Sequence, residues 1–406
     1  MNILFLSDNF PPEVNAPATR TYEHCREWVR MGAQVTVVTC APNYPAGKVF
    51  PGYRNRLRAV ETVDGIRVVR LWSYITANEG IVKRTLDYLS FAGTSLLGSL
   101  LEEADVIVAT SPQFFTALSG FGLSLLKRKP WIFELRDLWP ESIKTVGAMK
   151  DGAALRMLES LELFLYHQAS MIVAVTDSIR ENLVARGVDE SKVRVITNGA
   201  NLDLFRPVPR NQKLLYSLGL EDKYVIGYFG THGMAHGLDF ILDCAARIRD
   251  DRVHFIFVGD GAEKKNLLVK AGYMGLSNVT FLDPIQKHEI ARYIAISHAC
   301  LVPLKKRSTF RGAIPSKIFE SAAMQRPVLL GVEGQAQMII EEYRAGICFE
   351  PENHESFMEA VMQLLKKEEA YQKMQEGCKC LAQSFERRKL ARNMFEIIEQ
   401  TALKKE

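Results

Sequence analysis

Short apolar runs alternate with amphipathic helical patterns along the whole chain. The runs are rich in Val, Ile and Leu without polar alternation, which is typical of strands covered on both faces in a parallel sheet. In the first half the predicted strands are 3–6, 35–39, 67–71, 106–109, 131–135, 171–175 and 193–197. In the second half they are 224–229, 254–258, 279–282, 300–302, 328–330 and 347–349. This alternation predicts an α/β fold with doubly wound parallel sheets.

Helical patterns fill the intervals, for example 21–31, 153–168 and 178–186. Ser178 and Glu181 have the spacing of a capping box, and Gly187 follows as a stop signal.

The alternation lapses at 201–210, where the chain is polar and contains two prolines, and then restarts. A chain of 406 residues is also too long for one ordinary core. We therefore expect two Rossmann-like domains, 1–205 and 206–385, with a last helix in 386–406 that packs back on the first. A ligand is expected in the cleft between the halves, at the carboxyl ends of the strands.

Composition fits a soluble enzyme, with 47% hydrophobic and 24% charged residues. A net charge of +4 is too small to indicate nucleic-acid binding. Seven cysteines, an odd number, favour free thiols in a reducing compartment. Neither a secretory leader nor a spanning segment is expected, and the apolar stretch 88–101 reads as a core helix or as a face resting on a membrane.

Several kinds of catalytic chemistry lack their motifs. The chain has no P-loop, no Gly-x-Ser-x-Gly elbow and no His-Glu-x-x-His, and Lys264 stands where a dinucleotide fingerprint needs its third glycine. No Asp-x-Asp pair is present to clamp a metal. Any phosphate chemistry must therefore rely on side chains and helix ends. The stretch 307–328 suits it, because a basic loop leads into a helix with Lys317 and Glu320 on its first turn.

The linker 198–207 and the series Lys317, Glu320 and Pro327 resemble the retaining GT-B glycosyltransferases of family 4 over nearly the whole chain. The segments 11–14 and 134–142 resemble the branch of bacterial N-acetyl-L-fucosamine transferases. The resemblance implies transfer of that sugar from its UDP form to a polyprenyl-diphosphate-linked sugar, with retention and without a metal or other cofactor. Such enzymes assemble O-antigen, lipopolysaccharide and capsule.

For the donor, the resemblance implies that Glu320 accepts from the ribose hydroxyls and that Lys317 is the main diphosphate cation, with Arg311 as a second one. Each has a plainer reading as a solvated surface charge. The family's first glutamate is replaced by Gly312, which leaves sugar recognition open and is compatible with an acetamido or deoxy sugar.

The loop after strand 224–229 departs from the family too. Gly230 opens it, and Thr231 and His236 stand where the family has an arginine and a lysine for the diphosphate. His232 is a candidate phosphate donor or a plain loop histidine. Ile285 lies where the family's backbone pairs with the base.

The catalytic candidates are Arg136 and Asp137, which follow a strand where the family has a His-Asp pair. Arginine cannot act as a base at neutral pH, but it can hold a hydroxyl or phosphate oxygen. A purely structural ion pair is the alternative. Glu141 is a weaker candidate for the same edge.

For the acceptor, the resemblance implies contacts by three residues at the ends of the first strands. Asn15 lies in the first loop, where Asn15-Ala16 replaces the family's Gly-Gly pair. Arg20 opens the next predicted helix, and Ser111 follows a later strand.

Basic and aromatic residues in 53–58 and 72–84 precede the apolar stretch and suit the anionic inner face of the cytoplasmic membrane. A basic surface loop beside a core helix is nearly as good a reading. Two alternatives for the function stay open: a UDP-sugar 2-epimerase of the same architecture and a non-catalytic scaffold.

Overall fold

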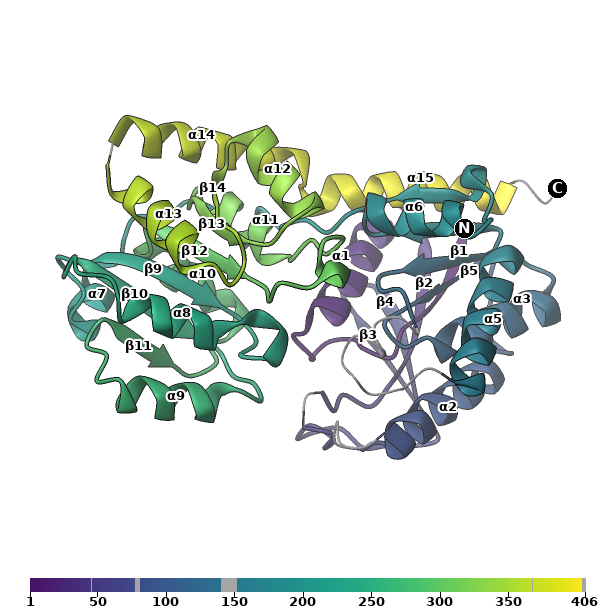
Figure 1. Ribbon diagram of the computed structural model, residues 1–406. Helices are drawn as coiled ribbons and strands as arrows, with labels where there is room; N and C mark the ends of the chain where they lie inside the picture. Colours follow the sequence, from purple (N-terminus) through teal and green to yellow (C-terminus); the bar gives the residue numbers. More distant parts are fainter. Residues whose placement is uncertain (45, 77–80, 140–151, 367, 404–406) are drawn as a thin grey trace. The chain divides into compact units, whose positions relative to one another are not determined.

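The computed structural model describes residues 1–44, 46–76, 81–139, 152–366 and 368–403. The chain forms two compact units, Met1–Thr197 with Arg387–Glu406, and Asn198–Glu386 (Figure 1). Each unit is a doubly wound α/β domain with helices on both faces of one sheet, as the strand pattern predicts. The first boundary lies eight residues before the predicted one. Its physical reason is Phe205, which is buried in the core of the second unit.

The first unit contains an eight-stranded sheet in the order β3-β4-β2-β1-β5-β6-β7-β8. All neighbours are parallel except β3 and β4, which form an antiparallel hairpin at the edge. The strands are β1 (Asn2–Leu6), β2 (Gln34–Cys40), β3 (Arg58–Val63), β4 (Ile66–Leu71), β5 (Val106–Thr110), β6 (Trp131–Leu135), β7 (Met171–Ala174) and β8 (Val193–Val195).

Strand β3 is absent from the strands predicted above. The signal was available, because Asp64 and Gly65 form the hairpin turn with φ angles of 49° and 82°, and Asp-Gly is a strong hairpin turn pair.

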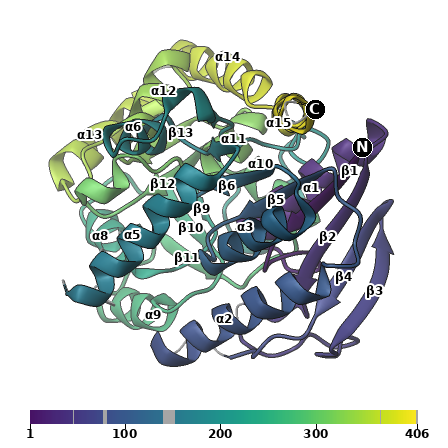
Figure 2. The ribbon, with the colours of Figure 1, turned by 90° about the vertical axis from the view of Figure 1, so that its right-hand side faces the viewer.

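The helices of the first unit are α1 (Ala16–Arg30), α2 (Ile81–Gly98), α3 (Phe115–Lys127), α5 (Ala153–Gln168), α6 (Asp177–Ala185) and α15 (Arg387–Leu403). Alternate residues of the strands point to opposite faces. One face packs on α1 and α15, and the other on α2, α3, α5 and α6. Figure 2 shows α2, α3 and α5 together on their face.

Two predicted helix starts were wrong. Helix α1 begins at Ala16 rather than at 21, because the Asn15 side chain caps it and a proline is tolerated in the first turn. Helix α6 is capped by Thr176, whose hydroxyl accepts from the backbone N–H of Ile179 at 3.2 Å, and not by Ser178.

The last helix, α15, is fixed to α1. The indole Nε1 of Trp28 donates to the carbonyl of Ala391 at 2.8 Å, and Arg387 lies 3.0 Å from Glu23. Residues near both ends of the chain therefore belong to the first unit.

The second unit has a six-stranded, all-parallel sheet in the order β11-β10-β9-β12-β13-β14. The strands are β9 (Tyr224–Phe229), β10 (Val253–Val258), β11 (Val279–Leu282), β12 (Ala299–Pro303), β13 (Val328–Gly331) and β14 (Gly346–Cys348). The helices are α7 (Gln212–Leu218), α8 (Leu238–Ala245), α9 (Lys264–Tyr273), α10 (Lys287–Ile296), α11 (Lys317–Ala323), α12 (Gln335–Tyr343), α13 (His354–Lys366) and α14 (Glu368–Ser384).

Both sheets have a point where the strand order reverses, between β1 and β5 in the first and between β9 and β12 in the second. The loops that leave such neighbours run in opposite directions, and open α/β sheets bind ligands there, outside the carboxyl ends of the strands. These two edges are where a site is expected.

Candidate functional site

The reversal point of the second sheet brings three predicted residues together. Gly230 directly follows β9, His232 lies two residues further on, and Lys317 is the first residue of α11, which follows the loop after β12. A Cβ on Gly230 would lie 2.7 Å from Cε of Lys317. Sequence positions almost ninety residues apart therefore meet at one sheet edge.

Lys317 rests on the ring of Tyr228, a residue of β9. Its Nζ donates to the Tyr228 hydroxyl at 2.7 Å and lies 3.9 Å from the ring centroid. The Tyr228 hydroxyl itself donates to the carbonyl of Thr231. A cation is attracted to the face of an aromatic ring, and the hydrogen bond fixes its position. Among the described residues, no carboxylate forms an ion pair with Lys317.

Burial lowers the pKa of Lys317 to about 7, and the charge of Glu320, one turn along α11, opposes that decrease. A buried amine loses its proton more easily because water no longer stabilises the ammonium, and here the charge of Glu320 compensates only in part. An anion at Nζ supplies the missing stabilisation. The arrangement therefore has the electrostatic character of an anion site, and Glu320 adds a carboxylate acceptor one turn away.

Glycines let the neighbouring loops approach each other. Gly230 has a φ of 134° and Gly259, after β10, has a φ of 146°. A Cβ on Gly259 would lie 2.0 Å from the carbonyl oxygen of Gly230. Only glycine adopts this backbone without a clash, so the residue type at Gly259 is set by the meeting of the two loops and that at Gly230 by its own φ and the Lys317 side chain.

His232 is completely buried. Its ring contacts Tyr228, Phe257 and Phe281, and neither ring nitrogen has a hydrogen-bond partner in the described part of the chain. Burial, together with Lys264 and Lys317, lowers the pKa of His232 to about 4, so the ring is neutral. The geometry favours a packing role, and phosphate binding by His232 stays a prediction.

The remaining donor candidates lie away from this contact set. Arg311 is exposed, and its Nε is 3.9 Å from a carboxylate oxygen of Glu333. Ile285 is partly buried and packs on the apolar core of the second unit. Neither placement tests the predicted contacts with diphosphate or base.

In the first unit, Arg20 is buried and engaged within the protein. Its Nε donates to Glu134 at 2.8 Å, and its other nitrogens donate to the carbonyls of Thr197 at 2.6 Å and Ile196 at 2.9 Å. Arg20 and Arg136 outweigh the effect of burial and lower the pKa of Glu134. This geometry favours a structural role for Arg20, and its predicted contact with the acceptor is untested.

Ser111 and Arg136 lie beside that ion pair. The Ser111 hydroxyl accepts from the backbone N–H of Arg136 at 2.8 Å, and Ser111 N–H donates to the carbonyl of Glu134 at 3.0 Å. Asp137, the next residue, is exposed, but desolvation by the surrounding protein raises the pKa of its carboxyl group, and the charge of Arg136 opposes that rise. The predicted catalytic pair thus lies at the carboxyl end of β6, while the Ser111 side chain is buried and already bonded.

Asn15 caps α1, because its Oδ1 accepts from Ala18 N–H at 2.8 Å and its amide nitrogen donates to Asn9. Both ends of the side chain are in use. Glu141, the weaker candidate, lies outside the described residues.

Tyr228 and Asp8 have no predicted role from the sequence. Tyr228 lies inside a strand, where its hydroxyl leaves no motif. Asp8 follows β1 at the reversal point of the first sheet, where burial, Asp87 and Glu13 raise its pKa to about 8. It holds a proton at neutral pH and can donate a hydrogen bond. Polar residues directly after β1 were the available signal.

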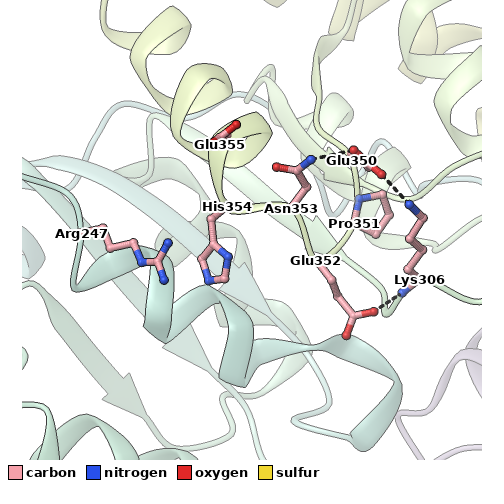
Figure 3. A pocket seen from close by; sticks show the side chains of 8 residues that line it. All are labelled: Arg247, Lys306, Glu350, Pro351, Glu352, Asn353, His354 and Glu355. Carbon is pink, nitrogen blue, oxygen red and sulfur yellow. Dashed lines mark hydrogen bonds and ion pairs between the residues drawn. The ribbon is translucent and has the colours of Figure 1, made fainter.

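A separate pocket of about 400 Å³ lies beside the β14–α13 turn. Figure 3 shows Lys306 bonded to Glu350 and Glu352, with His354 and Arg247 on the other side. None of the predicted site residues lines it. The charged groups along one side already pair with each other.

Exposed leucines gather on α2 and α3, which pack side by side (Figure 2). Leu97 is 69% exposed, and Leu101, just after α2, is 90% exposed. Leu125 and Leu126 of α3 are 62% and 63% exposed. Single exposed leucines are ordinary, but a group on adjacent helices indicates an interaction surface.

No helix within the described ranges is long and apolar enough to cross a membrane. No group of three His, Cys, Asp or Glu side chains in those ranges is suited to hold a metal ion. Independence from metal stays a prediction.

Comparison with protein families gives two matches. Residues 15–199 match the glycosyl transferase 4-like domain, and residues 223–367 match glycosyl transferases group 1. Together these matches cover most of both units. The chain belongs to the group 1 glycosyltransferases.

Two curated bacterial relatives are similar. The chain is 25% identical over 382 residues to WcaI of Escherichia coli, assigned as a colanic acid biosynthesis glycosyl transferase, covering 90% of this chain and 92% of WcaI. It is 26% identical over 220 residues to the glycosyltransferase WbjE of Pseudomonas aeruginosa, covering 53% and 55%.

Solved structures establish the fold. Sucrose-phosphate synthase of Thermosynechococcus elongatus superposes with a TM-score of 0.80 at 17% identity, covering 98% of both chains. HepE of Anabaena, solved with UDP, superposes with a TM-score of 0.73 at 17% identity, covering 98% of this chain and all of HepE. The architecture is GT-B, which confirms the predicted fold class.

Proposed function

We propose that this glycosyltransferase moves a sugar from a UDP donor to a lipid-diphosphate-linked sugar, with retention of configuration and without a metal. N-acetyl-L-fucosamine is the proposed sugar, and O-antigen or capsule assembly is the proposed context. The observation that carries the proposal is Lys317 on the Tyr228 ring at a sheet reversal point, because a desolvated amine that forms no ion pair with a described carboxylate suits a diphosphate. The UDP bound to the similarly folded HepE supports the choice of donor.

The chemistry follows from the leaving group. As the sugar departs, negative charge grows on the diphosphate, and a preorganised cation stabilises that charge most in a site that excludes water. Lys317 supplies this cation, and Glu320 accepts hydrogen bonds from the ribose hydroxyls. The departing phosphate oxygen takes the acceptor proton on the face it leaves. Configuration is thereby retained without a strong base of the enzyme.

Arg136 and Asp137 are proposed to act at the acceptor side. Burial lowers the pKa of Arg136 to about 10, although Glu134 opposes that shift. The guanidinium is still charged at neutral pH and can hold a hydroxyl or phosphate oxygen. The exposed carboxylate of Asp137 can accept from the acceptor hydroxyl.

Two observations support the choice of sugar and pathway. Gly312 stands where the family has a glutamate for sugar hydroxyls, which fits a deoxy or acetamido sugar with fewer such groups. The name of WcaI connects that relative with the synthesis of a polysaccharide.

A polyprenyl-linked acceptor implies work at the cytoplasmic face of the membrane. The leucines of α2 and α3 provide apolar area, and Lys83, Arg84 and Lys127 provide positive charge on the same helices. An anionic bilayer attracts each nearby cation by about 1 kcal/mol. We propose this surface as the membrane contact.

The transfer is tested by incubating UDP-sugars with a lipid-diphosphate-linked N-acetylglucosamine and measuring product mass. We expect an added deoxy-acetamido-hexose with EDTA present, and no product from Glu320→Ala. A product that carries an added hexose would show that the proposed donor sugar is wrong. Product formed only in the presence of a divalent ion would refute metal independence. Donor converted in the absence of acceptor would indicate the epimerase.

The membrane contact is tested by co-sedimentation with phosphatidylglycerol and phosphatidylcholine vesicles. We expect sedimentation with the anionic vesicles and its loss in Leu97→Glu/Leu101→Glu. Tyr273→Glu is the matched control, because Tyr273 is an exposed apolar residue at the end of α9 in the second unit. Equal sedimentation of the double variant and the wild type would contradict the assignment.

A further inference from the structure

We propose that Tyr228 is a positioning residue for the donor diphosphate: it holds Lys317 in the phosphate-binding position. This inference rests on the proposed function. It assigns a role to a residue inside strand β9. In the loop after this strand, Thr231 and His236 stand where the family has an arginine and a lysine for the diphosphate.

Tyr228 is itself firmly held. Its side chain is fully buried, and the ring lies 6.1 Å from that of Phe257 and 6.0 Å, edge to face, from that of His236. The hydroxyl hydrogen is committed to the carbonyl of Thr231. The hydroxyl oxygen can therefore only accept from Lys317, and the bond forms with either the ammonium or the neutral amine.

The direction of the lysine side chain follows from that bond. Nζ carries up to three hydrogens, one of which points to the Tyr228 oxygen, and the others stay available for phosphate oxygens. On the other side, Gly230 leaves no room for a Cβ beside Lys317. The ammonium is thus confined between a tyrosine and a glycine backbone, and a ligand meets it without first ordering a flexible side chain.

Few other charges face Lys317. Burial and Lys317 lower the pKa of His236 to about 3. Burial is also the main cause that lowers the pKa of His232 to about 4. Both histidines are therefore neutral at pH 7. Lys264 of α9 acts on this cluster through His232, and its amine is engaged with Asp283 at 2.8 Å. Glu320 is the carboxylate that acts on Lys317.

A diphosphate at Nζ reverses the effect of burial, because an adjacent negative charge favours the ammonium. At pH 8 the free enzyme therefore holds Lys317 mainly as the amine, and the complex holds it as the ammonium. Each binding event takes up close to one proton from solution. The terminal phosphate of UDP is already ionised at that pH.

The experiment is calorimetry of UDP binding between pH 7 and 9, in two buffers that differ in ionisation enthalpy. For the wild type we expect proton uptake at pH 8 and affinity that falls by up to tenfold per pH unit, the limit for one linked proton. Tyr228→Phe keeps the ring and loses the hydroxyl. We expect about tenfold weaker binding and a pH midpoint moved to lower values, with a larger loss for Tyr228→Leu.

Tyr224→Phe is the matched control. It removes the same hydroxyl from the same strand, but that hydroxyl donates to the carbonyl of Leu364 at 3.3 Å. We expect wild-type affinity and pH midpoint. A purely structural role for Tyr228 would weaken binding equally at every pH, and that result, or an unchanged Tyr228→Phe, would overturn the inference.

A second measurement separates this inference from the proposed function. Competitive acetylation read by mass gives the pKa of the Lys317 amine in the free protein, and Tyr228→Phe should lower it. If UDP does not bind but the amine pKa shifts in the variant, the proposed function fails and Tyr228 still holds Lys317. If the amine pKa is the same in both proteins, the positioning role is refuted.

Discussion

Lys317 and Arg20 received the same sequence-based interpretation, a cation that binds a ligand, and the structure places them in opposite surroundings. Arg20 is 1% exposed and donates to one carboxylate and two carbonyls. Lys317 contacts a tyrosine hydroxyl and ring, with no carboxylate ion pair among the described residues.

The difference between the two sites appears in the pKa values of their charged groups. Burial lowers the pKa of Lys317 to about 7, whereas in the other pair Arg20 lowers the pKa of Glu134. A buried charge that already has its counter-charge stabilises the fold and has little left for a ligand. A buried amine that forms no ion pair destabilises the fold, and an incoming anion removes that penalty.

Removing Arg20 should produce the largest change in folding. Arg20→Met leaves the buried Glu134 without its main partner, and breaking such a pair costs about 3–5 kcal/mol. Urea denaturation should show that loss in the free energy of unfolding, while UDP affinity of the folded protein stays at the wild-type value. Arg20→Met/Glu134→Leu should recover part of the stability. A drop in UDP affinity without a change in stability would show that Arg20 serves ligand binding and not the fold.

Lys317→Met should lower the affinity for UDP without lowering the free energy of unfolding. The variant loses a charge-assisted contact with the diphosphate, and we expect UDP affinity to fall about 100-fold, or about 2.7 kcal/mol. Calorimetry measures that loss, and the free energy of unfolding should not decrease. Lys306→Met is the matched control, because Lys306 pairs with Glu350 on the surface. An equal effect of both variants would show that bulk charge, and not position, matters.

The sequence predicted the framework because buried parallel strands have a local signature. The predicted strands 131–135 and 224–229 coincide with β6 and β9. Strand β3 was missed because its alternation R-A-V-E-T-V belongs to a half-exposed edge. The start of α1 was missed because its cap, Asn15, was interpreted as a ligand residue.

The site was less predictable because its roles depend on contacts far apart in sequence. Arg20 bonds to residues 114 and 177 positions away, and Lys317 to one 89 positions away. No local pattern distinguishes the two cations. Sequence could place both beside a sheet edge, but only the fold shows which cation forms an ion pair.

Gly230→Ala tests whether the confinement of Lys317 matters. A Cβ there would meet Cε of Lys317 at 2.7 Å in a backbone with a φ of 134°, so the amine must move away. We expect about tenfold weaker UDP binding, equivalent to about 1.4 kcal/mol. Gly275→Ala also has a positive φ, 61°, but no atom within 4 Å of the added Cβ. It should lose stability alone, and equal UDP affinities in the two variants would remove Gly230 from the site.

The contribution of Lys317 to the free energy of unfolding depends on pH. The folded-state pKa of Lys317 is about 7, below the ordinary lysine value of 10.5. Between these values the unfolded chain binds a proton that the folded protein lacks, so this residue makes the unfolding free energy rise with pH, by up to about 1.4 kcal/mol per unit. Below pH 7 both states carry the proton and the full penalty is present. Lys317→Met should therefore be more stable than the wild type at pH 6, with the difference shrinking towards pH 9 in urea denaturation. A difference that stays constant over that range would mean that Lys317 is charged throughout, like the paired Arg20.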